Sequence, residues 1–319
     1  MPRRLAAIAA AAAVALLAAG CGGGSTPPQS SNGTTKITVG VIPIVDVAPI
    51  YLGIKQGFFK AEGLDVKLET AQGGAAIVPA VVSGQYQFGF SNTTSLLLAG
   101  SQGLPLKVVS AGVASTGQDG KDFGAVIVKG DSPIRSPKDL AGKRVAVNTL
   151  KNINTTTVNN VVAKDGGDPS KISYVELPFP DIAAAVAKGD VDAGQVVEPF
   201  LTIATGQGDR QVVSNYAATD PDLMVGMYFT SQQFATQNAK LVDGFTAAMK
   251  KSLDYASSHE GAARAILADY TKIDPQVQKS MVLPRWPAEV DRDSVELLGE
   301  LATKDGLISK PVDLDSLLP

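Results

Sequence analysis

The chain has 319 residues, of which 45% are hydrophobic and 18% charged, with a formal net charge of −3. This composition is typical of a soluble globular protein and excludes a disordered chain. A slightly acidic balance without a basic stripe excludes a nucleic-acid-binding surface, so we expect no nucleic-acid partner. About 280 residues follow Thr35, more than one compact core usually holds, and two lobes are therefore expected.

The N-terminal segment predicts the compartment. Two arginines precede an apolar run, residues 5–19, which is shorter than the roughly 20 residues needed to cross a bilayer and is typical of a secretory signal. The run ends at Ala19-Gly20-Cys21, and Cys21 is the single cysteine of the chain. This stretch resembles a bacterial lipoprotein box, which implies a signal peptide at residues 1–20 and a lipid on Cys21. An ordinary signal peptide with a chance cysteine is the alternative.

Residues 21–35 are rich in Gly, Ser, Thr, Pro and Asn and show no apolar periodicity. Such a segment is a flexible tether. A lone cysteine in an exported protein cannot form an internal disulfide, and lipidation gives it a role. We therefore expect an extracytoplasmic protein, lipid-anchored at the outer face of the cell membrane or in the periplasm.

Strand and helix patterns alternate from residue 36 onward. The first run has strands at 37–41, 65–68, 87–90 and 107–113, with helices at 49–56, 73–82 and 92–99. The second has strands at 125–128, 143–147, 174–177 and 192–196. Repeated strand–helix–strand units predict an α/β fold with mostly parallel sheets covered by helices. After residue 223 the pattern is mainly helical.

Three segments resemble one family of binding proteins. The first runs from Ile50-Tyr51-Leu52-Gly53 through Gly57-Phe58-Phe59 to Glu62-Gly63-Leu64-Asp65-Val66. The second contains Leu177-Pro178, Asp181, Val191-Asp192-Ala193 and Glu198-Pro199, and the third contains Gly306-Leu307-Ile308. In this order they are similar to the nitrate/sulfonate/taurine and thiamine-pyrimidine-precursor binding family.

The resemblance implies a type II periplasmic-binding-protein fold, in which two α/β lobes joined by two crossover strands enclose a ligand cleft. Lobe 1 is expected at residues 36–112 and 224–319, and lobe 2 at residues 113–223. The implied function is that of the extracytoplasmic solute-binding component of an ABC importer. Such a protein, expected to be a monomer, captures a small polar molecule by hinge closure and delivers it to the transmembrane subunits of a permease.

The cleft residues are expected on loops that follow the strands. Ligands of open parallel sheets bind beyond the carboxyl ends of strands, where helix N-termini offer free N–H groups. Glycine pairs and Ser-Asn pairs there are also ordinary turn and cap chemistry. The candidates are Asp46, Val47, Gly73, Gly74, Ser91, Asn92 and Thr93 from the first lobe, and Asn148, Asn152, Asn154, Thr155 and Glu198 from the second.

The charges of these loops predict the ligand. They carry two carboxylates, Asp46 and Glu198, one lysine, Lys151, and no arginine. A buried carboxylate needs a donor or a cation, whereas a bare anion is usually met by arginine or a glycine-rich nest. We expect an amine-bearing or pyrimidine-like ligand, with Phe90, Phe179 or Phe200 as a stacking face. The family usually carries a Gly-Ser-type turn where this chain has the Asn/Thr-rich residues 148–156.

The alternative ligand is an oxyanion such as a sulfonate or nitrate. In that case Asp46 turns outward and caps the helix that begins near Pro49, and backbone amides hold the anion.

Catalytic sets are missing from the sequence. His259 is the only histidine, so that neither a Cys/His pair nor a zinc set can be assembled with a lipidated Cys21. No Walker loop or nucleophile elbow is present. We expect no enzyme activity, no metal and no cofactor. Two other functions remain open: a pyrimidine-synthesising enzyme of the same family, and an adhesion or signalling lipoprotein that binds no ligand.

Overall fold

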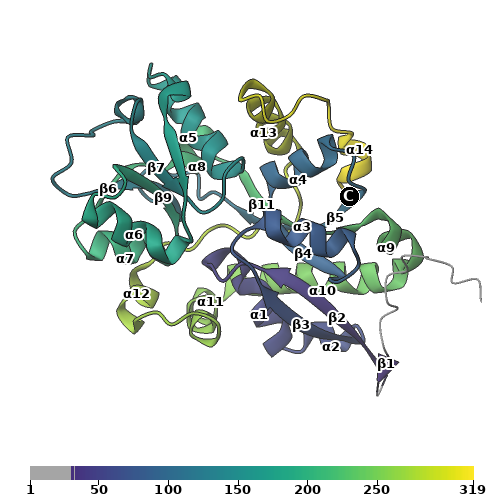
Figure 1. The fold of residues 1–319 in the computed structure, drawn as a ribbon. Coiled ribbons are helices and arrows are strands. Elements are labelled where there is room, and N and C mark those ends of the chain that lie inside the picture. Colours follow the sequence, from purple (N-terminus) through teal and green to yellow (C-terminus); the bar gives the residue numbers. More distant parts are fainter. Residues whose placement is uncertain (1–29, 32) are drawn as a thin grey trace, which may run out of the picture.

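The computed structural model describes residues 30, 31 and 33–319. The predicted signal peptide and Cys21 lie outside the described residues. The described chain forms two α/β lobes, each built on one sheet (Figure 1). No helix in this part of the chain is long and apolar enough to cross a membrane.

The first lobe is built on a six-stranded sheet with the order β3-β2-β4-β11-β5, and the short β1 pairs with β2. The strands β3 and β4 run parallel to β2, whereas β11 runs antiparallel to both β4 and β5. The strand bounds are β1 Ser30–Ser31, β2 Thr34–Val41, β3 Leu64–Thr70, β4 Phe88–Asn92, β5 Leu106–Ala114 and β11 Met224–Ser231. Because β11 lies between β4 and β5, it brings the last third of the chain back to this sheet.

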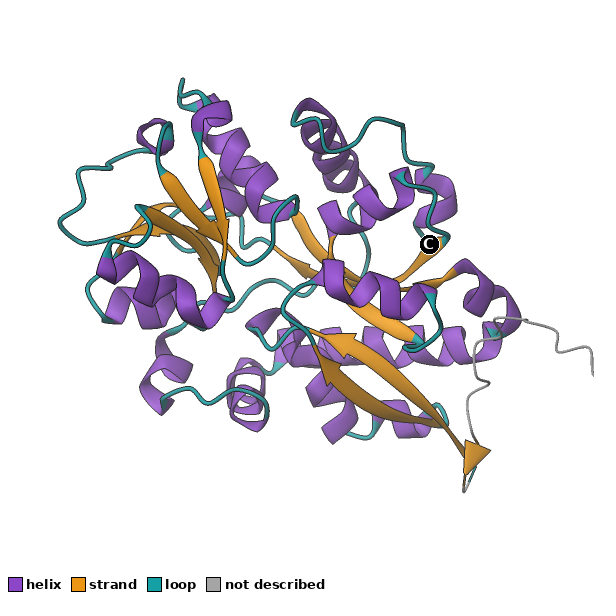
Figure 2. Ribbon diagram, in the orientation of Figure 1, coloured by secondary structure: helices purple, strands orange, loops and turns teal. Residues whose placement is uncertain are grey.

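Helices cover both faces of this sheet (Figure 2). The long α10 packs along α1 and α2, and its Phe245 ring stacks on Phe88 of β4 with ring centroids 3.9 Å apart. The bounds are α1 Ala48–Lys55, α2 Phe58–Ala61, α3 Gly74–Val82, α4 Thr93–Ser101, α9 Gln232–Gln237, α10 Ala239–Ser258, α11 Glu260–Ile266, α12 Pro275–Ser280, α13 Arg292–Lys304 and α14 Leu314–Leu317.

The second lobe has a five-stranded sheet with the order β10-β6-β9-β7-β8. The strands β8 and β9 run parallel to β7, and β6 runs antiparallel to β9 and β10. The bounds are β6 Gly124–Val128, β7 Arg144–Val147, β8 Ser173–Glu176, β9 Ala193–Val197, β10 Arg210–Val213, α5 Ile153–Lys164, α6 Phe179–Lys188, α7 Phe200–Gly206 and α8 Asn215–Thr219. The predicted α/β class with two lobes is confirmed; the edge strand β10 was not anticipated.

Two segments join the lobes, and a third segment of the first lobe reaches across to the second. Residues 115–123 and 220–223 make the two expected crossings. The third is made by residues 267–286, where α12 packs against α7 of the second lobe and the chain returns through an antiparallel bridge between Ala114 and Arg285. This third segment adds a contact between the lobes besides the two crossings.

Candidate functional site

The two lobes touch each other through hydrogen bonds at the ends of their strands. The Asn92 side-chain oxygen accepts the backbone N–H of Ile153 at 3.3 Å, and the Asn148 amide donates to the Gln72 carbonyl at 3.3 Å. In the first lobe Asn92 is the last residue of β4, and Gln72 follows β3. In the second lobe Asn148 and Ile153 follow β7. The structure therefore holds the lobes closed on one another.

A small cavity lies at this boundary, and we call it the inner chamber. Its volume is about 20 Å³, the space of about one water molecule, so a larger solute needs the lobes to separate before it enters. Both lobes contribute to it. Its polar lining is Asp46, Asn92, Asn148, Asn152, Asn154 and Tyr216, and its apolar lining is Ile42, Ile44, Phe90, Ile153, Phe179, Val197 and Val225.

The asparagines after β7 form a hydrogen-bonded network. The Asn148 side-chain oxygen accepts the amides of Asn152 at 2.9 Å and Asn154 at 2.7 Å. The Asn154 oxygen accepts the Tyr216 hydroxyl at 2.5 Å. The Asn152 oxygen accepts the N–H of Asn154 at 3.0 Å and so caps α5. These bonds fix the loop, and in them the Asn148 and Asn154 amides each donate one of their two N–H groups.

Asp46 is the one carboxylate that lines the inner chamber. It lies in the 3-10 turn Val45–Val47, its side chain is 3% exposed, and its Oδ1 is buried without a hydrogen-bond partner in the described residues. Burial raises the pKa of Asp46 to about 7; a hydrogen bond from its own backbone N–H opposes this, and the charge of Asp122 adds to it. A buried carboxylate oxygen without a partner is costly, so it suits a ligand that donates a hydrogen bond.

The turn itself excludes a capping role for Asp46. The residue before α1 is Val47, and no side chain caps this helix. The indole N–H of Trp286 donates to the Asp46 carbonyl at 3.1 Å, which holds the turn with its side chain inward. The alternative in which Asp46 turns outward as a helix cap is therefore wrong.

Phenol groups surround this carboxylate. Tyr216 and Tyr228 are buried and Tyr270 is half-buried; removal from water, followed by nearby groups including Asp46, raises the pKa of each well above its usual value. These rings therefore stay neutral, and no lysine or arginine lines the chamber. Nothing in the lining compensates a charge on Asp46.

Glu198, the other predicted ligand carboxylate, has a different set of partners. It is 1% exposed, and its oxygens accept the Thr202 N–H at 3.0 Å, the Thr202 hydroxyl at 2.8 Å and the Val282 N–H at 3.0 Å. Glu198 does not line the inner chamber. Its carboxylate instead binds the first turn of α7 and, through Val282, holds residues 267–286 against the second lobe.

Five of the twelve predicted ligand residues line the chamber: Asp46, Asn92, Asn148, Asn152 and Asn154. Others shape its walls. The Thr93 hydroxyl donates to the Met224 carbonyl, and a Cβ on Gly74 would lie 1.9 Å from the Ser91 hydroxyl. Val47, Gly73, Ser91 and Thr155 also lie behind or beside the lining. Tyr216 was missed, because it comes from α8 and has no motif of its own.

A second cavity of about 310 Å³ adjoins the inner chamber and shares Ile42, Ile44 and Phe179 with it. We call it the vestibule. It opens between the carboxyl ends of β2 and β3 in the first lobe and the N-termini of α6 and α7 in the second. Its lining residues are Ile42, Pro43, Ile44, Thr70, Ala71, Gln72, Pro178, Phe179, Pro180 and Phe200.

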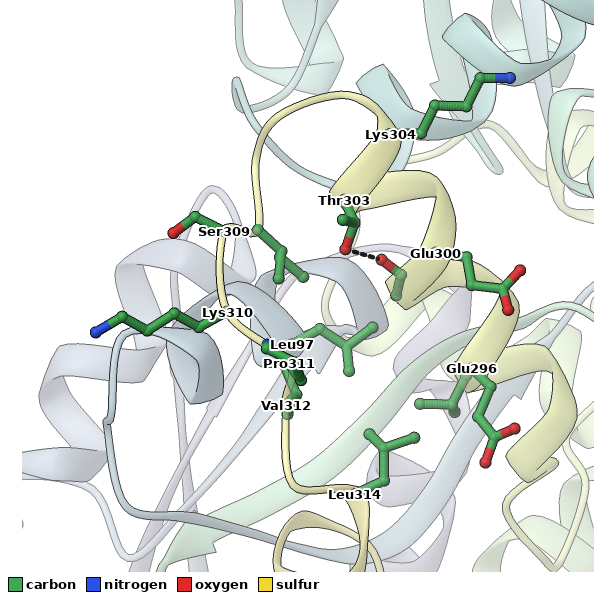
Figure 3. Close-up of a pocket in the computed structure, with 13 residues that line it drawn as sticks. Leu97, Glu296, Glu300, Thr303, Lys304, Ser309, Lys310, Pro311, Val312 and Leu314 are labelled. Carbon is green, nitrogen blue, oxygen red and sulfur yellow. Dashed lines mark hydrogen bonds between the residues drawn. The ribbon is translucent and has the colours of Figure 1, made fainter.

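A larger hollow lies elsewhere, on the first lobe between α4, α13 and residues 308–314, with a volume of about 640 Å³. In Figure 3 Leu97, Val312 and Leu314 gather inside it, whereas Glu300 and Lys310 point away. No residue of the second lobe lines this hollow, so lobe closure cannot enclose a solute in it. The cleft between the lobes is the better candidate despite its smaller volume.

Comparison with known proteins gives the family. The profile of the NMT1/THI5-like family matches residues 44–263, which is more than half of the chain. This chain belongs to the NMT1/THI5-like family. The predicted resemblance is thereby confirmed.

The relatives of this chain include binding proteins and enzymes. The taurine-binding periplasmic protein of Escherichia coli K12 is 30% identical over 194 residues, which cover 59% of this chain and 56% of that protein. A 4-amino-5-hydroxymethyl-2-methylpyrimidine phosphate synthase of Aspergillus parasiticus is 24% identical over 229 residues, covering 68% of this chain and 64% of that enzyme. The aligned part of this chain thus spans a little over half of the taurine-binding protein and somewhat less than two thirds of the synthase.

The solved structure of the alkanesulfonate-binding protein from Xanthomonas axonopodis pv. citri, bound to MOPS, has the same fold. Its TM-score to this chain is 0.75 at 18% identity, with 89% of this chain and 98% of that chain covered. The predicted type II periplasmic-binding-protein fold is confirmed. A small-solute-binding function for an importer, predicted from the sequence, agrees with the names of the binding proteins in this family, and an extracytoplasmic location agrees with the periplasmic relative.

Proposed function

We propose that this chain is the extracytoplasmic solute-binding component of an ABC importer. It captures a small polar molecule between its lobes and delivers it to a permease when the lobes part. The observation that carries the proposal is the unpartnered, buried Asp46 oxygen in a chamber to which both lobes contribute. Opening and closing about the crossings would expose and enclose this group, as in other hinge-closing binding proteins.

The ligand proposed is a molecule with N–H or ammonium groups, such as an aminopyrimidine. Asp46 would accept its donor, and the remaining N–H of Asn154 would reach an acceptor on the ligand. Phe90 and Phe179, which both line the chamber, offer faces for a planar ring. Asn148 and Asn152 act by holding the loop in place.

An oxyanion is the second candidate, and one observation favours it. The Asn92–Ile153 hydrogen bond places the N-termini of α4 and α5 side by side at the chamber. Two helix N-termini attract negative charge. A charged Asp46 repels an anion beside it. A zwitterion such as taurine would place its ammonium group at Asp46 and its sulfonate at the two helix N-termini.

Catalysis is not part of the proposal, although one group of relatives is named as pyrimidine phosphate synthases. The groups that line the inner chamber are a carboxyl, four amides, a phenol and hydrocarbon side chains. His259 is exposed and stacks on Tyr255 with ring centroids 4.0 Å apart, outside the cleft. In the described residues no three His, Cys, Asp or Glu side chains form a group that could hold a metal ion.

We further propose that a lipid on Cys21 holds the chain at the membrane, with residues 21–35 as the tether. The chain would act as a monomer that binds the permease subunits. The support is the sequence of the lipoprotein box.

Isothermal titration calorimetry tests the ligand class. The panel is 4-amino-5-hydroxymethyl-2-methylpyrimidine, taurine, ethanesulfonate and nitrate, titrated into the wild type, Asp46→Asn and the control Asp65→Asn, which changes an exposed carboxylate on β3. The pyrimidine is expected to bind best and to lose at least about tenfold in affinity in Asp46→Asn, since a charge-assisted hydrogen bond contributes about 1.5–3 kcal/mol. Tighter binding of nitrate or ethanesulfonate, strengthened further in Asp46→Asn, would establish the oxyanion instead.

A further inference from the structure

The cleft contains two cavities of opposite character. The inner chamber is small and carries Asp46 and four asparagines, whereas every side chain that lines the vestibule is uncharged and most are apolar. Three residues, Ile42, Ile44 and Phe179, belong to both linings, so the two spaces lie next to each other and share one wall. A solute whose polar end lies at Asp46 would direct its other end into the vestibule.

Two aromatic rings form the second-lobe wall of the vestibule. Phe179 and Phe200 are the first residues of α6 and α7, and their rings are stacked with centroids 6.0 Å apart and planes inclined by 11°. Phe179 is 6% exposed, while Phe200 is half-buried. Pro178 and Pro180 stand on either side of Phe179 and hold the entry to α6 in a fixed conformation. The wall offers two nearly parallel apolar rings.

The first lobe supplies the opposite wall. Pro43 lies beyond β2, and Thr70 and Ala71 lie at the end of β3, so that opening of the lobes would separate the two walls. The volume of about 310 Å³ exceeds the roughly 150 Å³ that suffices for a benzene-sized guest in an apolar cavity. The space fits one ring or a short hydrocarbon chain.

We infer that the vestibule is a second subsite of the cleft, which holds an apolar, ring-sized substituent of the solute against Phe179 and Phe200. The inference deepens the proposed solute-binding function and rests on it. It requires a ligand with two parts, a polar head at the inner chamber and an apolar tail that is enclosed only when the lobes close.

Four small probes separate the contribution of the tail from that of the head. Acetamidine and benzamidine share a cationic head, and methanesulfonate and benzenesulfonate share an anionic one; the second member of each pair adds a phenyl ring. Affinities are measured by calorimetry up to millimolar concentration. For whichever head is bound better, the ring is expected to tighten binding at least tenfold.

Two variants place this effect in the vestibule. Phe200→Ala removes one stacking face, and Thr70→Trp fills the space from an exposed position of the first lobe. Each is expected to reduce the advantage of the ring to less than threefold and to leave the affinity of the ring-free probe unchanged. The control is Phe58→Ala, because Phe58 is also a half-buried first residue of a helix but lies in α2, outside both cavities.

The outcomes distinguish the subsite from the ligand charge. A ring advantage with the sulfonates alone would overturn the amine-bearing ligand and keep the vestibule. Binding of amidines without a ring advantage would overturn the vestibule and keep the amine-bearing ligand. The inference also falls if neither ring-bearing probe binds at millimolar concentration, or if the advantage persists in both Phe200→Ala and Thr70→Trp.

Discussion

The side chain of Asn92 links the two lobes: its oxygen accepts the N–H of Ser95 at 2.9 Å, within its own helix, and the N–H of Ile153 at 3.3 Å, across the cleft. One acceptor therefore serves the first turns of α4 and α5. The closed arrangement depends in part on a group that also faces the inner chamber.

Replacement of Asn92 by alanine is expected to loosen the closed state. Loss of the cap lowers the free energy of unfolding by about 1 kcal/mol, and loss of the bond to Ile153 increases the radius of gyration measured by small-angle scattering. Asp291→Ala is the matched control, since Asp291 caps α13 through the Ser294 N–H at 2.9 Å and makes no contact with the second lobe through this bond. Equal radii for both variants would show that the Asn92 bond does not hold the lobes together.

The stability of the folded chain is expected to depend on pH through Asp46. The pKa of this carboxyl is about 7 in the folded state against 3.8 for its usual value, so the folded chain keeps a proton that the unfolded chain loses above about pH 4. Stability therefore falls as pH rises from about 4 to 7 and levels off above 7. A pKa difference of about 3 corresponds to roughly 4 kcal/mol.

Urea unfolding of the wild type and Asp46→Asn from pH 4 to 8 checks this sign. Asparagine cannot ionise, so the free energy of unfolding of the variant is expected to rise relative to that of the wild type as pH rises, by up to about 4 kcal/mol at pH 8. Glu198 and Asp209, whose pKa values burial also raises, remain in both proteins and cancel in the difference. Parallel pH profiles would mean that Asp46 ionises freely in the folded state.

Glu198 is expected to act on stability rather than on ligand affinity. Glu198→Ala removes the acceptor of the Thr202 and Val282 donors and should lower the free energy of unfolding by about 3 kcal/mol, because half-buried donors lose their carboxylate partner. Glu198→Gln keeps the shape of the side chain, and the Kd of the tightest probe is expected to stay within threefold of the wild-type value. A tenfold loss of affinity in Glu198→Gln with unchanged stability would restore Glu198 as a ligand residue.

Anchoring is tested at Cys21, which lies outside the described residues. Cys21→Ser is expected to move the protein from the membrane fraction to the medium or periplasm without changing its melting temperature, because the two lobes are built from residues 33–319. Intact mass of the membrane-extracted wild type should show a lipid on residue 21 and no residues before it. An unmodified Cys21 behind an uncleaved N-terminus would contradict the lipoprotein assignment.

Local signals in the sequence were enough to find the loop after β7. Asn148, Asn152 and Asn154 are close in the chain, and an asparagine before a helix is ordinary capping chemistry, so their joint position followed from the strand–loop–helix pattern. The βαβ alternation predicted both sheets for the same reason. The sequence therefore predicts features that depend on residues within one loop or one helix.

Contacts between distant parts of the chain were not reached. The Glu198 carboxylate binds Val282, which lies 84 residues further along the chain. No periodicity in the sequence predicts that α12 packs against the second lobe. Tyr216 lies 62 residues beyond the Asn154 oxygen that it contacts. These pairings depend on how complete elements pack, so a carboxylate on a cleft loop could not be told apart from a carboxylate held by the chain itself.

The pH dependence of binding tests whether Asp46 contacts the ligand. The amidinium of benzamidine stays cationic between pH 5 and 8 and would need Asp46 ionised, so its affinity is expected to rise about tenfold per pH unit below about 7 and to level off above it. Benzenesulfonate should show the opposite slope, because the neutral carboxyl no longer repels it. In Asp46→Asn both slopes are expected to vanish. A benzamidine affinity that is flat or falls with pH in the wild type would remove Asp46 from the ligand contact, and tighter binding of benzenesulfonate than of benzamidine over the whole range from pH 5 to 8 would establish the oxyanion.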